Sequence, residues 1–75
     1  MPSQKFKEVK AMGRKKIWVY VLEFWDPFER EKFQVEVKHE NEEVARREAS
    51  KERKAYENEG YQFIEQWKTW EWGAA

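Results

Sequence analysis

The chain has 75 residues and no cysteine, and its 15 basic and 15 acidic side chains give a formal net charge of zero. This length allows one small domain, and the lack of cysteine excludes a disulfide framework, a thiolate metal cluster and a cysteine nucleophile. The balanced charge argues against a protein that binds nucleic acid through its overall charge. No apolar span of membrane length and no signal-peptide pattern occurs, so we expect a cytoplasmic protein that does not cross a membrane.

Aromatic side chains are the most unusual part of the composition, with five tryptophans, five phenylalanines and three tyrosines. Disordered chains usually combine high net charge with few aromatic residues, and this chain shows the opposite. Each buried ring removes about 150–250 Å² from water, so roughly eight rings could supply most of a small core. We therefore expect a folded but marginally stable domain, which oligomerisation could stabilise further.

Residues 1–16 are expected to form a basic N-terminal arm with a single acidic side chain. Such a cluster can contact phosphates or an acidic protein surface, or it can act only as a solubilising arm that protects a sheet edge. The candidate contact residues for nucleic acid or an acidic partner are Lys5, Lys7, Lys10, Arg14, Lys15 and Lys16.

Two strand-like segments follow, separated by a turn signal. Residues 17–25, IWVYVLEFW, are β-branched and aromatic, which is typical of a strand with both faces covered. Asp26-Pro27 favours a turn, because proline presets the backbone for its second position. Residues 33–38, FQVEVK, alternate strictly between apolar and polar, as a strand with one apolar face does. The sequence therefore predicts a β-hairpin.

The loop length decides which side chains of the hairpin share a face. We favour a four-residue loop over residues 26–29. The resulting pairs are Leu22–Phe33, Tyr20–Val35, Trp18–Val37 and Glu23–Lys32. A three- or five-residue loop would instead align Val19 and Val21 with the valines of the second strand.

Residues 41–59 predict a helix with a narrow apolar stripe. Asn41 suits the N-cap, and Gly60 stands where a glycine commonly ends a helix. The stripe consists of Ala45, Ala49 and Tyr56, flanked by Val44 and Ala55. An alanine seam lets a helix lie close to a sheet, so we expect bulky sheet residues such as Trp18 and Tyr20 to fill the remaining space.

Residues 61–72, YQFIEQWKTWEW, predict the third strand, and residues 73–75 are expected to be frayed. Aromatic residues occur at both parities, which implies two covered faces or a β-bulge near Glu65-Gln66. The elements predict an α+β fold, a single ββαβ domain over residues 17–72. We expect a three-stranded, mostly antiparallel sheet in the order 2-1-3 with one helix packed on one face.

No residue pattern indicates an enzyme. His39 is the single histidine, and a general base needs a nucleophile or a carboxylate held against it. The carboxylates lie on the expected helix surface or beside lysine and arginine, without the ligand spacing of a calcium loop. Three glycines form no phosphate-binding loop. We expect no catalytic residue, no metal and no cofactor.

Three tryptophans near the C-terminus are the strongest candidates for a binding surface. Tryptophan is enriched at binding hot spots, and large apolar patches on small domains mark interfaces. Because one helix covers one face only, we expect an open apolar face built from Ile17, Val19, Val21, Ile64, Trp70 and Trp72. The candidate partner-binding residues are Trp67, Trp70, Trp72, Ile64, Val19 and Val21.

These observations favour a small non-enzymatic interaction module that buries an aromatic sheet face against a second copy, as a homodimer, or against a larger protein. The second choice is a nucleic-acid-binding domain that uses the basic arm and exposed aromatic rings. The interleaved Glu65 and Glu71 work against this alternative. A further alternative, suggested by size and composition, is a small phage or mobile-element inhibitor of a host protein.

Overall fold

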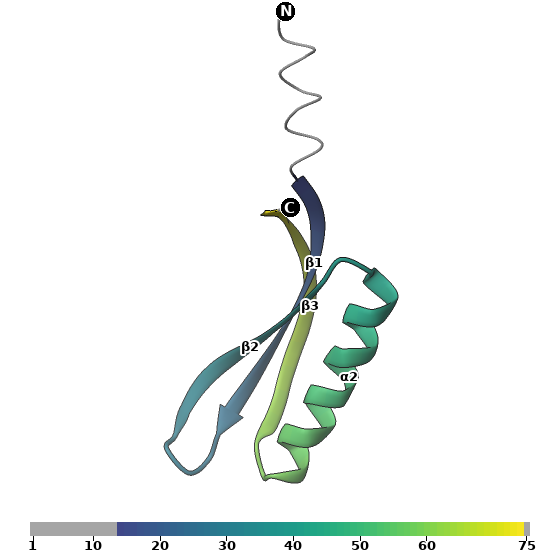
Figure 1. Cartoon of the computed structure of the whole chain (residues 1–75). Helices are drawn as coiled ribbons and strands as arrows, with labels where there is room; N and C mark the ends of the chain where they lie inside the picture. Colours follow the sequence, from purple (N-terminus) through teal and green to yellow (C-terminus); the bar gives the residue numbers. More distant parts are fainter. Residues whose placement is uncertain (1–13, 75) are drawn as a thin grey trace, which may run out of the picture.

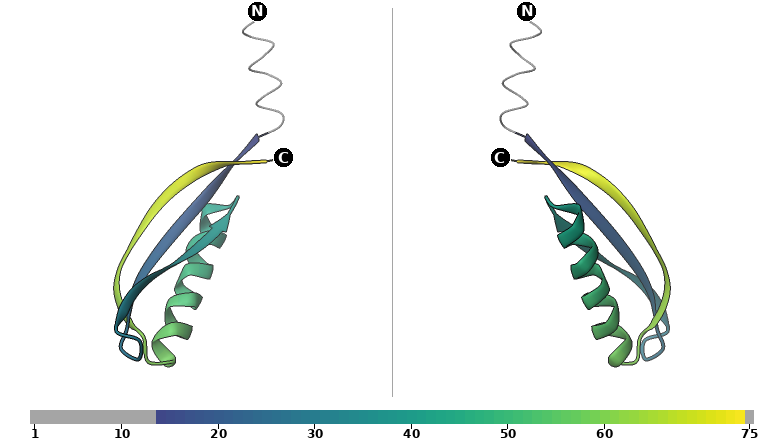
Figure 2. Two further views of the ribbon diagram at one scale, coloured as in Figure 1. Left: turned by 90° about the vertical axis from the view of Figure 1, so that its left-hand side faces the viewer. Right: turned by 90° about the vertical axis from the view of Figure 1, so that its right-hand side faces the viewer.

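The computed structural model describes residues 14–74, which form a three-stranded sheet and one helix (Figure 1). In chain order the elements are β1 (Arg14–Asp26), β2 (Glu31–His39), α2 (Glu42–Asn58) and β3 (Gln62–Ala74). β1 lies in the centre and pairs antiparallel with both neighbours, so the α+β fold and the predicted strand order 2-1-3 are confirmed. The helix covers one face of this sheet (Figure 2).

Two strands, the central β1 and the outer β3, are longer than the hydrophobic pattern predicts. β1 begins at Arg14, three residues before the expected start, and β3 continues to Ala74. Pairing joins Arg14 to Ala74 and Lys16 to Trp72. Because the ladder is made of backbone hydrogen bonds, it extends through residues with no apolar pattern. Arg14, Lys15 and Lys16 thus belong to the sheet, whereas Lys5, Lys7 and Lys10 lie outside the described residues.

The hairpin register differs from the predicted one by two residues. The observed partners are Trp18–His39, Tyr20–Val37, Leu22–Val35, Glu23–Gln34 and Phe24–Phe33. The turn occupies residues 27–30, because the Asp26 carboxylate accepts hydrogen bonds from the backbone N–H groups of Phe28 (2.8 Å) and Glu29 (3.1 Å). A shift of two residues keeps every side chain on its predicted face, so Trp18 and Tyr20 still face the helix.

The helix ends and its apolar seam are as the sequence predicts. The Asn41 side chain caps the first turn by accepting a hydrogen bond from the Val44 N–H at 3.2 Å. Gly60 follows the last turn with φ +103°, a conformation that favours glycine. Ala45 and Ala49 are fully buried, and their small side chains let the helix lie close to the sheet.

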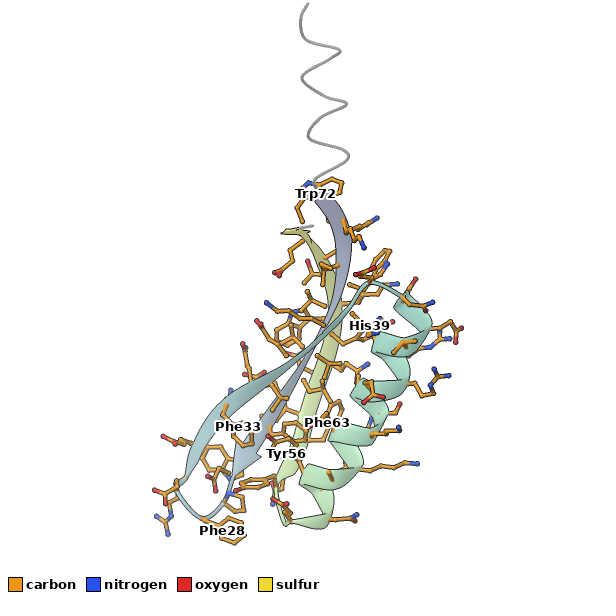
Figure 3. All side chains as sticks on the ribbon, viewed as in Figure 1. Phe28, Phe33, His39, Tyr56, Phe63 and Trp72 are labelled. Carbon is orange, nitrogen blue, oxygen red and sulfur yellow. The ribbon has the colours of Figure 1, made fainter. Side chains whose placement is uncertain are left out.

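The core between α2 and the sheet is built mainly of aromatic rings. Phe24 and Leu22 are fully buried on β1. The Phe24 ring centroid lies 5.5 Å from Phe33 in a stacked pair, 5.1 Å from Tyr56 in a tilted pair and 5.8 Å from Phe63 in an edge-to-face pair, all within the range of separations that aromatic pairs favour. Figure 3 shows Phe33, Tyr56 and Phe63 in the region between the strands and the C-terminal half of the helix.

A β-bulge in β3 changes the face on which its side chains lie. Glu65 pairs with Glu23 and Phe63 with Phe24, so Ile64 is an extra residue in the ladder. The bulge is therefore present, immediately before the predicted position at Glu65-Gln66. Phe63 lies on the helix face, whereas Trp67, although of the same parity, lies on the opposite face.

Candidate interaction surface

The sheet face opposite α2 is less open than predicted, and the prediction that Val19 and Val21 are available to a partner is wrong. Val19 and Val21 are only 3% and 5% exposed. The Lys38 ammonium lies 3.1 Å from the Glu71 carboxylate. Since Lys38 pairs with Val19 and Glu71 pairs with Ile17, this ion pair crosses β1 diagonally. The aliphatic stems of such long side chains cover small β-branched residues on a central strand.

The hydrogen bond between Lys38 and Glu71, with their charge attraction, raises the pKa of the Lys38 ammonium above its usual value. Both side chains are about half exposed, so the bridge remains in contact with water. Trp67 stands on the same face beside Val21 and is 38% exposed. Ile64 projects from the bulge and is 41% exposed. This face therefore carries the partly exposed Trp67 and Ile64 together with the charged side chains of Lys38 and Glu71.

Trp70 and Trp72 lie on the other face, the one that carries the helix. Trp70 pairs with Trp18 and Trp72 with Lys16, and side chains of directly paired residues share a face. The prediction that placed these two tryptophans with Val19 is therefore wrong. The reason is the bulge at Ile64, which reverses the parity of every β3 residue that follows it.

These rings gather where the β1–β3 ribbon continues past the start of α2. Trp70 and Trp72 are 44% and 56% exposed, and their ring centroids lie 5.2 Å apart at an interplanar angle of 83°. Figure 3 shows Trp72 at the end of the molecule opposite Phe28. We call Trp18, Trp70, Trp72 and Lys16 the tryptophan cluster.

Lys16 is the cationic member of the tryptophan cluster. Its Nζ lies 4.4 Å from the ring centroid of Trp18 and 4.8 Å from that of Trp70. An ammonium within about 6 Å of an indole is attracted to the ring face. Among residues 14–74, Lys16 forms no ion pair. The cluster thus presents ring surface together with one ammonium that lacks a carboxylate partner in the described chain.

A second bridge fixes β3 to the helix beside the cluster. The Lys68 ammonium lies 2.6 Å from the Glu42 carboxylate and 5.4 Å from the Trp18 ring centroid. The hydrogen bond from Lys68 lowers the pKa of Glu42, and the same bond raises the pKa of Lys68. Tyr20 also donates a long hydrogen bond of 3.5 Å to Glu42. The bridge gives Lys68 an acidic partner and links β3 to the start of the helix.

The remaining charges around the cluster are arranged by the strand register. Glu65 and Glu71 lie on the opposite face of the sheet, away from Trp70 and Trp72. Lys15 pairs with Glu40 at 3.6 Å, in the turn before α2. The helix start therefore brings its acidic side chains close to basic residues of β1 and β3.

His39 has a structural contact. Its Nδ1 accepts a hydrogen bond from the backbone N–H of Asn41 at 2.9 Å, which helps to shape the turn before the helix. Within the described part of the chain, no group of three or more metal-ligating side chains occurs. The arrangement offers aromatic surface and charge for binding.

No protein-family model, curated protein or solved structure matches the chain. Between residues 14 and 74, no helix is long and apolar enough to span a bilayer. The geometry of the tryptophan cluster is therefore the basis for a functional interpretation. Its members Trp70 and Trp72 were found by composition alone, but Trp18 and Lys16 were not grouped with them, because only the β1–β3 register brings the four side chains together.

Proposed function

We propose that the protein is a non-enzymatic interaction module that binds a protein partner through the tryptophan cluster. The observation that carries this proposal is that Trp70 and Trp72 remain 44% and 56% exposed at one end of the sheet. Large rings left together in water on a small domain mark an interface, and tryptophan is the residue type most enriched at binding hot spots.

The charge around the rings favours a protein partner over a polyanion. Lys68 is neutralised by Glu42, and Lys15 by Glu40, so two basic side chains at this end already have acidic partners. The ammonium of Lys16 is the basic group of the cluster that has no ion-pair partner among residues 14–74. A matching surface would present apolar side chains to the rings and a carboxylate to Lys16, with the polar contact at the rim.

The tryptophan cluster is also held in place before any partner arrives. Trp18 and Trp70 are directly opposite each other in the β1–β3 ladder, and Lys16 contacts both rings. Trp70 and Trp72 support each other edge to face. Side chains fixed in this way lose little conformational freedom on binding, which leaves more of the contact energy for affinity.

The proposal can be tested with a double variant, Trp70→Ala with Trp72→Ala, and a matched control, Trp67→Ala, which removes a similarly exposed ring from the opposite face. Partners captured by the wild-type chain are identified and purified, and their affinity for all three chains is measured. Loss of a hot spot of at least 2 kcal/mol corresponds to roughly a thirtyfold weaker affinity for the double variant. Equal affinities in chains with unchanged circular dichroism spectra would contradict the proposal.

A second candidate function, binding of single-stranded nucleic acid, is favoured by one arrangement. Glu65 and Glu71 lie on the far face, so they do not interrupt the ring surface beside Lys16. Bases could stack on Trp72 while phosphates contact the basic start of β1. A titration with short single-stranded oligonucleotides would then quench tryptophan fluorescence, with an affinity that falls steeply as salt is added. Unchanged fluorescence at low salt would exclude this function.

A further inference from the structure

The outer edge of β3 is the longest unprotected strand edge in the described chain. β3 spans 13 residues, and its side chains from Ile64 to Trp72 are all exposed. No other strand of residues 14–74 pairs with its outer side, because the sheet ends there. Figure 2 shows β3 along the outer side of the molecule, away from most of α2. Its backbone donors and acceptors on this side are available to another strand.

The two edges of the sheet differ in how they discourage such pairing. Proteins protect exposed edges with short strands and charged side chains. β2 has nine residues, of which the charged ones are Glu31, Lys32, Glu36 and Lys38. β3 has 13 residues, of which the charged ones are Glu65, Lys68 and Glu71. Only the bulge at Ile64 interrupts the outer edge of β3, so residues 65–74 form its regular open part.

We infer that β3 pairs antiparallel with β3 of a second copy, with Thr69 opposite Thr69 on the two-fold axis, so that two sheets join into one of six strands. This inference rests on the proposed function and extends it, because the dimer places the tryptophan clusters of both copies on one face of a continuous sheet. A two-fold axis perpendicular to the sheet keeps both helices on that face.

The choice of register follows from the side chains that each alignment would oppose. Pairing about Thr69 sets Lys68 opposite the Trp70 of the second copy, and it opposes no like charges. Pairing about Lys68 would oppose two ammonium groups, which is unfavourable.

The position of the bulge and the end of β3 support the same centre. Pairing about Thr69 uses residues 65–73 and stops where the bulge at Ile64 begins. Pairing about Trp67 would draw the bulge into the new ladder, and pairing about Trp70 would move the nine-residue overlap onto Ala74, the last residue of β3. Pairing about Thr69 therefore keeps the overlap clear of both the bulge and the end of the strand, without opposed like charges.

The small size of the buried core also favours association with a second copy. The fully covered apolar side chains in the described residues are Val19, Tyr20, Val21, Leu22, Phe24, Ala45 and Ala49. A chain with so small a core gains stability by burying further surface against another molecule. Trp67 and Trp70 flank the proposed axis on opposite faces, so the added strand would cover part of each ring from the side.

The absence of cysteine from the sequence permits a direct test by single-cysteine cross-linking. Residues directly opposite in an antiparallel pair have Cα atoms about 4.5–5.5 Å apart, which lies within the range that a disulfide spans. Under mild oxidation, Thr69→Cys should form a covalent dimer. Gln34→Cys, at an exposed position in the middle of β2, is the matched control. We expect Thr69→Cys to cross-link roughly tenfold faster or more, because proximity makes the reaction effectively intramolecular.

A charge-swap experiment tests the same axis without covalent chemistry. Thr69→Glu and Thr69→Lys each place two like charges opposite each other, so each variant alone should dimerise roughly tenfold more weakly or worse than the wild type. An equimolar mixture opposes a carboxylate and an ammonium and should restore dimers. Sedimentation across a concentration series measures both effects.

The inference is overturned if the wild type stays monomeric and Thr69→Cys cross-links no faster than Gln34→Cys. In that case a loss of partner binding by the Trp70 and Trp72 double variant would still support the proposed function. Dimers that resist both Thr69→Glu and Thr69→Lys would also overturn the inference, since the two-fold axis would then lie elsewhere.

Discussion

Replacing Phe24 by alanine should remove most of the stability of this domain, whereas the same change at Phe28 should be tolerated. Phe24 is completely buried and its ring lies within 6 Å of three other rings, those of Phe33, Tyr56 and Phe63. Phe28 stands on the hairpin turn, is 68% exposed and contacts the ring of Tyr61 at 5.8 Å. The two positions therefore compare one residue type in opposite environments.

The expected magnitudes follow from the buried fraction. Truncation of a fully buried phenylalanine costs about 3–5 kcal/mol, and a domain of this size is stable by roughly 3–9 kcal/mol. Phe28 buries about a third of its surface, and full burial is worth about 1.5–3 kcal/mol, so its truncation should cost about 0.5–1 kcal/mol. Phe24→Leu keeps an apolar side chain but loses the ring contacts, and should cost about 1–3 kcal/mol.

Urea unfolding followed by far-ultraviolet circular dichroism measures these differences at one fixed protein concentration, because self-association would shift the midpoint. The urea midpoint of Phe28→Ala should be slightly lower than that of the wild type, and the midpoint of Phe24→Leu should be clearly lower. Phe24→Ala should have the lowest midpoint or show no folded baseline. Equal midpoints for Phe24→Ala and Phe28→Ala would refute the assignment of Phe24 to the centre of the core.

Three further changes probe the helix ends. Gly60→Ala should destabilise the fold by about 1–2 kcal/mol, because Gly60 has φ +103° and an added Cβ would lie 3.0 Å from the Phe28 ring. An unchanged thermal midpoint of unfolding would contradict this prediction. Asn41→Ala removes the helix cap and should lower the free energy of unfolding in urea by about 0.5–2 kcal/mol. Asn41→Asp keeps a capping oxygen and should leave that free energy unchanged. Glu42, whose pKa the Lys68 hydrogen bond lowers, contributes stability above its unfolded-state pKa and loses it as pH falls through its folded-state pKa. Glu42→Gln should therefore weaken the fold at neutral pH and flatten its acid dependence, and parallel pH curves would contradict this.

Local patterns were enough to predict the elements and much of the architecture, because capping, turn and strand signals act over a few residues. Strict alternation in residues 33–38 predicts a strand, and Asn41 and Gly60 mark the helix ends that the structure shows. The alanine seam identifies the helix face that contacts the sheet, and Ala45 and Ala49 are fully buried there. The turn signal at Asp26-Pro27 predicts the hairpin, but the register predicted from it differs from the observed register by two residues.

The position of the proposed binding surface depends on contacts between strands that are far apart in the sequence. The bulge at Ile64 reverses the face of Trp70 and Trp72, and its position depends on the pairing of β3 with β1, which are about 50 residues apart along the chain. The ion pair of Lys38 and Glu71 crosses the opposite face and joins residues that are 33 positions apart in the sequence. Local pattern cannot specify such contacts, because which side chains meet across a sheet is set by strand register and by the position of a single extra residue.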